Sequence, residues 1–263
     1  MDVKIEALYI YPLKSAQGIP LAEMSISNSG PQWDRQWMLI DNKNDFVSQR
    51  KEPKLCLISQ KLTNDSLLLS APEMDDLKIP FYQESSHTEV VTLFNKETTA
   101  CFVGKIFDEW FSDFLKKPFR LVRSPQEPSR WTSGNHGPVR ELLFPDGYPF
   151  LLTSVETLEE LNSKLQAQVE MARFRPNIVV SGAKANEEDS WKSFSINGIS
   201  FDSVKACTRC SIITVDPKTS LPNNEVMRVL GSYRRKDGKI IFGNNLVHHN
   251  TGSVKVGDTL QFN

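Results

Sequence analysis

The strongest constraint on the fold is a succession of short apolar segments separated by turn residues. In the first eighty residues such segments lie at 3–10, 37–40 and 67–69, and Pro12 follows the first of them. Residues 41–44 read as a turn after the second segment, and Phe46 and Val47 start a return strand. Several short strands with frequent turns indicate a barrel or a sandwich.

The second half of the chain contains further strand signals. They lie at 177–182, 195–200, 211–215, 240–241, 254–256 and 260–262. The clearest is 195–200, because an Asn-Gly pair at Asn197 and Gly198 between β-prone residues is typical of a two-residue hairpin turn.

A few segments follow the helical period instead. Apolar residues of 105–117 fall on one face of an amphipathic helix. A second helix is predicted from Ser154, a suitable N-cap, through 165, and a short third over 225–230, ended by Gly231. Residues 126–145 are irregular and form a functional loop or a linker. The chain is therefore predicted to be mainly β with a few helices, an α+β fold.

Composition excludes several classes of protein. The 31 Lys and Arg residues nearly balance 32 Asp and Glu residues, so the net charge of −1 gives no footprint for nucleic acid or a membrane surface. No apolar run approaches the roughly 20 residues that span a bilayer. The N-terminal segment lacks the pattern of a signal peptide, so we expect a cytoplasmic protein. In that reducing compartment the four cysteines are not expected to form a disulfide framework.

The motif with the most chemical content is Cys207-Thr208-Arg209-Cys210. A zinc site needs further ligands, and the other two cysteines form no second CxxC, while His248 and His249 would point to opposite faces of a strand. A dithiol redox pair usually begins a helix, whereas 211–215 predicts a strand. The motif alone leaves four interpretations: zinc ligation, a dithiol pair, inert buried cysteines or a single functional thiolate.

Polar and basic residues lie at the ends of several predicted strands. They are Lys14, Ser15, Arg35, Arg175 and Asn177. Such side chains can hold a phosphate or a polar heterocycle through charge-assisted hydrogen bonds. Each basic residue alone is more often a solvated surface charge. Because Arg175 precedes a proline, its backbone is expected to be extended.

The chain resembles MOSC-domain proteins, which are named for the C-terminal domain of molybdenum cofactor sulfurases, and among them the amidoxime-reducing component group with its bacterial relatives. The resemblance covers nearly the whole chain. Its landmarks are the segments 11–15 (YPLKS), 34–37 (DRQW), 149–152 (PFLL), 174–179 (FRPNIV), 188–191 (EDSW), 206–210 (ACTRC), 214–219 (TVDPKT) and 254–258 (VKVGD).

This resemblance implies a fold and a cofactor. The fold is an N-terminal β-barrel-like domain over 1–122, packed on a C-terminal MOSC β-barrel over 123–263. The cofactor is Mo-molybdopterin, the molybdenum cofactor, with the thiolate of Cys210 as the metal ligand. Lys14, Ser15, Arg35, Arg175 and Asn177 are implied to hold the pterin or its phosphate, with Thr208 close by. Cys207 corresponds to a cysteine that is not the ligand.

The implied activity is reduction of N-hydroxylated small molecules, namely hydroxylamines, N-hydroxylated bases and amidoximes. A soft thiolate suits molybdenum and leaves room for oxygen ligands. Electrons are expected from a separate donor protein, which is a ferredoxin, a flavoprotein reductase or a cytochrome-type protein, because no cluster of cysteines follows the MOSC segment. The alternative is a non-redox carrier of the cofactor or of sulfur. No pyridoxal phosphate domain of the sulfurase type is expected. Ser220 occupies a position that is usually Gly in the family.

Overall fold

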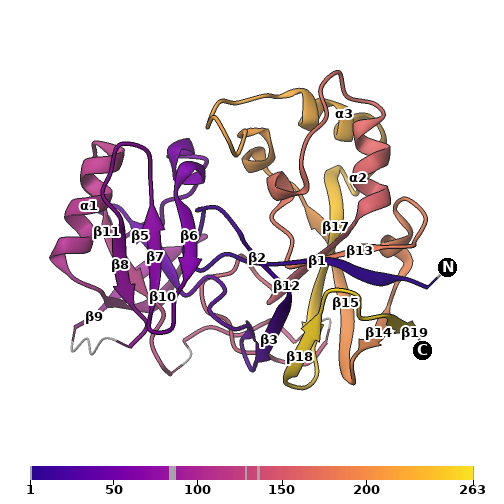
Figure 1. The fold of residues 1–263 in the computed structure, drawn as a ribbon, viewed down its shortest axis with the longest axis horizontal. Coiled ribbons are helices and arrows are strands. Elements are labelled where there is room, and N and C mark those ends of the chain that lie inside the picture. Colours follow the sequence, from indigo (N-terminus) through magenta and orange to yellow (C-terminus); the bar gives the residue numbers. More distant parts are fainter. Residues whose placement is uncertain (1, 83–86, 128, 135–136, 263) are drawn as a thin grey trace.

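The computed structural model is built mainly from strands, with three α-helices among the residues it describes (Figure 1). It describes residues 2–82, 87–127, 129–134 and 137–262. The predicted α+β class is confirmed. Pro128, which belongs to the predicted irregular segment, lies outside the described residues. No helix in the described part of the chain is long and apolar enough to cross a membrane.

A nine-stranded sheet dominates the C-terminal half and includes the first two strands of the chain. Its order is β19-β14-β15-β17-β12-β13-β1-β2, and β16 pairs with β17. These strands are β1 (Lys4–Ile10), β2 (Ile19–Leu21), β12 (Phe150–Ser154), β13 (Ile178–Ser181), β14 (Ser193–Ile196), β15 (Ile199–Thr208), β16 (Arg235–Lys236), β17 (Lys239–His248) and β19 (Leu260–Phe262). Leu8 of β1 pairs with Ile178 of β13, so the sheet joins distant parts of the sequence.

The N-terminal half contributes two smaller sheets and a helix. One sheet has the order β5-β11-β10-β9 and the other β6-β7-β8. Their bounds are β5 (Trp37–Ile40), β6 (Ser59–Leu62), β7 (Ser66–Ser70), β8 (Leu77–Pro80), β9 (Thr88–Leu93), β10 (Lys96–Phe102) and β11 (Arg120–Arg123). Helix α1 (Lys105–Leu115) lies against β11 and β8 and buries its aromatic face, as its period predicts.

A third small sheet links the two halves. Strand β18 (Gly252–Lys255), from near the C-terminus, pairs with β3 (Glu23–Ser27), which also pairs with β4 (Gly30–Pro31). One cluster of buried apolar side chains extends from Ile5 through Phe111 to Leu260 and therefore belongs to both halves. The predicted boundary between residues 122 and 123 stays a prediction, but the chain crosses from one half to the other on both sides of it.

The described part of the chain contains two further α-helices and four 3₁₀ helices. They are α2 (Val155–Asn162), α3 (Glu225–Tyr233) and the 3₁₀ helices η1 (Pro53–Leu57), η2 (Met171–Phe174), η3 (Glu187–Ser190) and η4 (Ser211–Thr214). Ser154 caps α2 as predicted, because its hydroxyl accepts a hydrogen bond from Thr157 N. The helix ends at Asn162, three residues before the predicted end.

Two sequence predictions about local structure are wrong. The β-prone run 211–215 forms η4 rather than a strand, because Ile213 turns into a separate apolar cluster with Phe174 and Phe242. Gly231 does not end the third helix and lies inside α3, which continues to Tyr233. The Asn197-Gly198 hairpin is confirmed, with Ile196 paired directly to Ile199.

Candidate functional site

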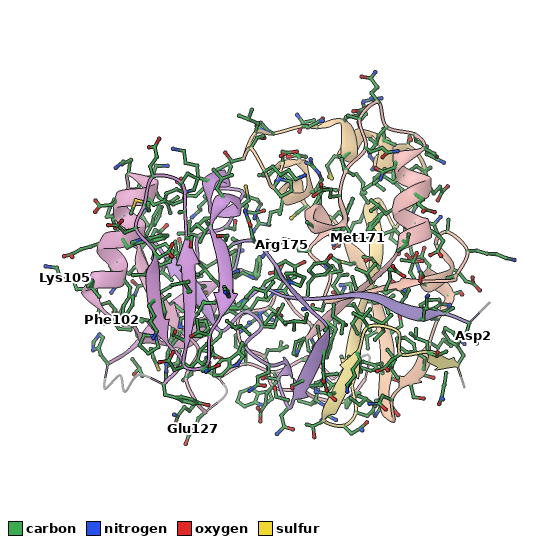
Figure 2. All side chains as sticks on the ribbon, viewed as in Figure 1. Asp2, Phe102, Lys105, Glu127, Met171 and Arg175 are labelled. Carbon is green, nitrogen blue, oxygen red and sulfur yellow. The ribbon has the colours of Figure 1, made fainter. Side chains whose placement is uncertain are left out.

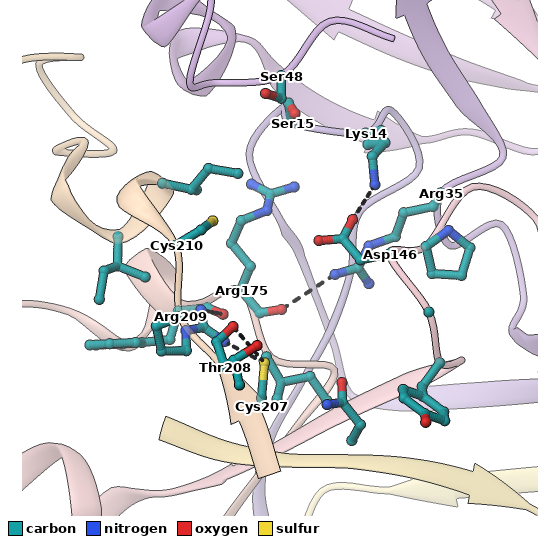
Figure 3. A pocket seen from close by; sticks show the side chains of 18 of the residues that line it. Lys14, Ser15, Arg35, Ser48, Asp146, Arg175, Cys207, Thr208, Arg209 and Cys210 are labelled. Atoms are coloured by element: carbon teal, nitrogen blue, oxygen red, sulfur yellow. Dashed lines mark hydrogen bonds and ion pairs between the residues drawn. The ribbon is translucent and has the colours of Figure 1, made fainter. Parts of the chain in front are cut away.

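All seven predicted site residues line one pocket between the two halves of the molecule (Figure 3). They are Lys14, Ser15, Arg35, Arg175, Asn177, Thr208 and Cys210. The pocket has a volume of about 850 Å³ when its open mouth is included. Arg175 lies at the junction between the N-terminal sheets and the C-terminal half (Figure 2). The structure therefore brings these residues together, and the role of each stays a prediction.

Cys210 lies two residues after the end of β15. Its backbone is extended, at φ −108° and ψ 179°, and it forms the N-cap of η4. Arg209 N donates a hydrogen bond to Ile240 O at 2.8 Å, which fixes the chain just before the cysteine. The side chain of Cys210 is half-buried and lines the pocket. The backbone on both sides of Cys210 is therefore fixed, while its thiol remains accessible from the pocket.

Cys207 has different surroundings from Cys210. Arg209 Nη1 donates a hydrogen bond to Cys207 Sγ at 3.0 Å, and Arg209 Nη2 donates to Phe174 O at 2.7 Å. Arg209 therefore contacts Cys207 rather than its sequence neighbour Cys210. Arg209 Nε is buried and has no hydrogen-bond partner in the described structure.

Tyr11 organises two of the predicted basic residues and was not among the predicted site residues. The Cζ atoms of Arg35 and Arg175 lie 4.4 Å and 4.3 Å from the centre of its ring. Tyr11 Oη donates a hydrogen bond to Pro176 O at 3.0 Å, and Arg175 Nη1 donates to Ala16 O at 2.6 Å. Burial lowers the pKa of Arg175 to about 10, so it remains charged at neutral pH. Tyr11 is part of the segment 11–15. The local sequence does not distinguish a tyrosine whose ring contacts two cations from an ordinary core tyrosine, so the sequence analysis did not identify it.

Arg35 is held by a network at the base of the pocket. Its Nη1 donates to Asp34 Oδ2 at 2.5 Å and to Asn177 Oδ1 at 3.2 Å. Asn177 Nδ2 in turn donates to Asp34 Oδ1 and to Tyr9 O, each at 3.2 Å. The side chain of Asn177 therefore orients Arg35, while a direct contact between Asn177 and a cofactor stays a prediction.

Lys14 is buried beside an acidic residue that the sequence analysis missed. Its Nζ donates to Phe144 O at 2.9 Å and forms an ion pair with Asp146. Burial lowers the pKa of the Lys14 ammonium, and Asp146 partly offsets this effect. The Asp146 side chain is 68% exposed, so it can move away from Lys14 when an anion arrives. It follows the irregular segment 126–145, where no period predicts which side chain faces inward.

Three predicted site residues have a backbone conformation that side-chain-bearing residues rarely adopt. Ser15, Arg35 and Arg175 have φ values of 76°, 50° and 58°. The prediction of an extended backbone at Arg175 is therefore wrong. Left-handed conformations at non-glycine residues are costly and gather at functional sites, where surrounding contacts enforce them. Here the Tyr11 ring and the Ala16 carbonyl hold the Arg175 guanidinium in place.

The charge of the pocket suits an anionic ligand. Five cationic side chains line it, against one carboxylate, that of Asp146. The five are Lys14, Arg35, Arg50, Arg175 and Arg209. Phosphate oxygens and a polar heterocycle match such donors, and a soft thiolate in the same pocket matches molybdenum. The residues present therefore fit a phosphorylated pterin that carries the metal.

The zinc interpretation of the CxxC motif requires further ligands. Within the described ranges, no group of three or more His, Cys, Asp and Glu side chains is placed to hold a metal ion. His248 and His249 diverge as the sequence predicted. His248 Nε2 donates to Ser27 O at 2.8 Å, whereas His249 Nε2 contacts Asp202 Oδ2 at 2.7 Å.

Comparison with known proteins agrees with this geometry. The family model for the MOSC N-terminal beta barrel domain matches residues 2–118, and that for the MOSC domain matches residues 139–261. Human mitochondrial amidoxime-reducing component 1 is 35% identical over 274 aligned residues, which cover 97% of this chain and 81% of the human protein. The chain belongs to the MOSC family.

Two further MOSC relatives show the range of proteins in the family. Human mitochondrial amidoxime reducing component 2 is 33% identical, with 97% of this chain and 82% of the human protein covered. The molybdenum cofactor sulfurase of rice is 30% identical over 92% of this chain but only 32% of the rice protein. The names of the two human relatives place them in mitochondria, so the cytoplasmic location expected for this MOSC protein stays a prediction.

Proposed function

We propose that this MOSC protein binds the molybdenum cofactor and reduces N-hydroxylated compounds, which include hydroxylamines, N-hydroxylated bases and amidoximes. The observation that carries the proposal is the pocket in which the Cys210 thiol lies beside five cationic side chains. The similarity to amidoxime-reducing components over almost the whole chain supports a reductase.

The residues of the pocket divide into two roles in this proposal. Cys210 binds the metal through its thiolate, and Thr208, the last residue of β15, lies beside it. Lys14, Ser15 and the pair Arg35 and Arg175 bind the pterin and its phosphate, with Asn177 behind Arg35. When bound, the cofactor supplies two-electron chemistry with transfer of an oxygen atom.

The protein itself fixes the positions of the binding groups before any ligand arrives. The Tyr11 ring and backbone carbonyls hold Arg35 and Arg175, so little side-chain entropy is lost when they bind an anion. Lys14 exchanges its ion pair with Asp146 for a phosphate oxygen. Reduction of an N–OH group to N–H consumes two electrons and two protons and releases water. We propose that a separate donor protein of the ferredoxin, flavoprotein reductase or cytochrome type supplies the electrons.

Metal analysis and enzyme assays test the proposal together. Protein purified from a host that makes the cofactor should contain molybdenum and a pterin that becomes fluorescent on oxidation. With a chemical electron donor it should reduce N-hydroxylaminopurine or benzamidoxime. Protein that is fully loaded with cofactor and reduces neither compound would contradict the reductase assignment.

A second candidate function follows from the similarity to a sulfurase. The part of the rice protein that this chain matches belongs to a molybdenum cofactor sulfurase, so a carrier of the cofactor or of sulfur is the alternative. In that case Cys210 would hold a persulfide. Mass spectrometry of the peptide that contains Cys210 distinguishes the two functions, because a persulfide adds about 32 Da to its mass.

A further inference from the structure

Two phenylalanine side chains form one wall of the pocket, and the proposed cofactor contacts do not use them. The rings of Phe46 and Phe94 have their centres 4.6 Å apart and are tilted by 54°. Both line the same pocket as Cys210, and both are only partly buried. We call this pair the Phe46–Phe94 platform.

The backbone that carries Phe94 is strained. Phe94 and Asn95 are the two loop residues of the hairpin between β9 and β10, because Leu93 pairs directly with Lys96. Their φ values are 55° and 60°, as a type I′ turn requires. Asn and Gly are the residues that favour both positions of this turn, whereas a bulky aromatic residue at positive φ is an outlier. A strained position that presents a large ring to a pocket points to a function for that ring.

Phe46 is fixed to the adjacent strand. Its N–H donates a hydrogen bond to Thr92 O at 3.0 Å, and Thr92 N donates to Asn44 O at 2.8 Å. Both rings therefore stand on neighbouring, hydrogen-bonded backbone. On their other side they contact a small apolar cluster that includes Val91 and Leu93. The platform thus packs against this cluster and also lines the pocket.

Two cations accompany the rings. Lys14 Nζ lies 5.6 Å and 5.2 Å from the centres of Phe46 and Phe94, and Arg50 Cζ lies 5.9 Å and 5.8 Å from them. Lys14 is buried with Asp146, but Arg50 is exposed. Arg50 also lines an adjoining open hollow of about 490 Å³ together with both rings. A planar group resting on the rings would therefore meet the Arg50 guanidinium, which stacks on aromatic faces.

We propose that the Phe46–Phe94 platform binds the planar aromatic or heteroaromatic part of the substrate, with Arg50 as the adjacent cation. The site then binds aryl and heteroaryl N-hydroxylated compounds more tightly than aliphatic compounds that carry the same reacting group. This inference rests on the proposed reductase function and adds the substrate class and the residues that select it.

Binding measurements on two amidoximes test the platform. The cofactor-loaded, oxidised protein is titrated without an electron donor, with benzamidoxime as the aromatic ligand and acetamidoxime as the aliphatic one. Phe94→Leu keeps an apolar side chain at the strained position but removes the ring. It should weaken benzamidoxime binding by roughly three- to ten-fold and leave acetamidoxime binding unchanged. Phe94→Tyr, the matched control, should bind both ligands as the original chain does.

Three results would overturn the inference. The first is an equal loss of affinity for both ligands in Phe94→Leu. The second is that the original chain binds benzamidoxime no more tightly than acetamidoxime. The third is a lower pterin content in Phe94→Leu. The last would show that the rings contact the cofactor instead. Phe46→Leu provides a second variant, in a different segment of the chain, in case Phe94→Leu does not fold, and the same three results apply to it.

The test separates this inference from the proposed function. If the original chain binds benzamidoxime through the platform but does not reduce it, the reductase assignment fails and the platform stands. If the original chain reduces both amidoximes and Phe94→Leu does so with unchanged KM values, the reductase assignment stands and the platform fails.

Discussion

At the scale of single residues, the site depends on contacts that local sequence does not encode. Arg175 precedes a proline, which favours an extended backbone, yet its φ is 58°. The stacking on Tyr11, a residue more than 160 positions away, accompanies this conformation. The sequence and its family resemblance were sufficient to name seven of the residues that line the pocket, but not the backbone conformation that directs their side chains. Nothing in the sequence indicated that Asp146 pairs with Lys14.

The two cysteines of the CxxC motif should respond differently to substitution. Cys210→Ser should abolish reduction of benzamidoxime, because a neutral hydroxyl is a poor replacement for a soft thiolate at molybdenum. It should leave much of the pterin bound, since the basic residues remain. Cys207→Ser should retain most of the activity, because its hydroxyl can still accept the hydrogen bond from Arg209. Equal loss in both variants would instead indicate a dithiol or zinc site.

Removal of one guanidinium should weaken cofactor binding. Charge-assisted hydrogen bonds contribute about 1.5–3 kcal/mol each, so Arg175→Ala should lower cofactor affinity about ten- to a hundred-fold. Fluorescence of the oxidised pterin measures the content of the purified protein. Arg228→Ala is the matched control, because Arg228 is exposed and does not line the pocket. Unchanged pterin in Arg175→Ala would remove this residue from the cofactor site.

At the scale of elements, the sequence predicts best where local chemistry decides the structure. The Asn197-Gly198 turn and the amphipathic helix α1 appear as predicted, since one depends on backbone preference and the other on an apolar face. The prediction for 211–215 fails because packing of Ile213 overrides the β propensity of the run. There Ile213 packs with Phe174, whose position is set by a different part of the chain.

The contact between β17 and β3 should make stability depend on pH. A carbonyl can only accept, so His248 Nε2 carries the proton donated to Ser27 O, and Nδ1 is buried without a partner. Burial lowers the pKa of His248 to about 4 from its ordinary 6.5. Between those values the unfolded chain binds a proton that the folded chain excludes. Stability should therefore fall as pH falls through this window, by at most about 3 kcal/mol.

Urea denaturation at a series of pH values measures this dependence. The glutamine of His248→Gln can still donate a hydrogen bond to Ser27 O but does not titrate. The free energy of unfolding of this variant should therefore depend less steeply on pH than that of the original chain. His249→Gln changes the neighbouring exposed histidine and separates any effect of that position from the effect of His248. If His248→Gln and the original chain show the same pH dependence, the proton is not excluded at His248.

At the scale of the whole molecule, the two halves share a core, a sheet and the site. Strands β1 and β2 lie in the large sheet with β13, and β18 returns to pair with β3. The family resemblance predicted two β-rich domains, and strand periods predicted some of the strands, among them β1, β5 and β13. Neither could predict that strands of one half pair with strands of the other. Pairing between two segments far apart in the sequence leaves no periodic signal in either segment.

Separate expression of the two halves tests how far they depend on each other. A fragment over 123–263 lacks β1, so the edge of β13 with buried Ile178 and Val180 would be exposed, and β18 would lose β3. It should show no cooperative thermal transition by near-UV circular dichroism, whereas its co-expression with 1–122 should restore one. A cooperative transition in the isolated fragment would establish the second half as an independent folding unit.

The pairing of β1 with β13 also has a consequence during synthesis on the ribosome. Leu8 pairs with Ile178, so β1 leaves the ribosome 170 residues before its partner strand exists. At translation rates of about 5–20 residues per second, that interval lasts on the order of ten seconds or longer. Throughout it β1, with the apolar residues Ile5 and Leu8, can pair with β2 on one edge but has no partner strand on the other. The nascent chain must therefore be shielded from aggregation until most of it has emerged, which makes this strand a natural place for a chaperone to bind.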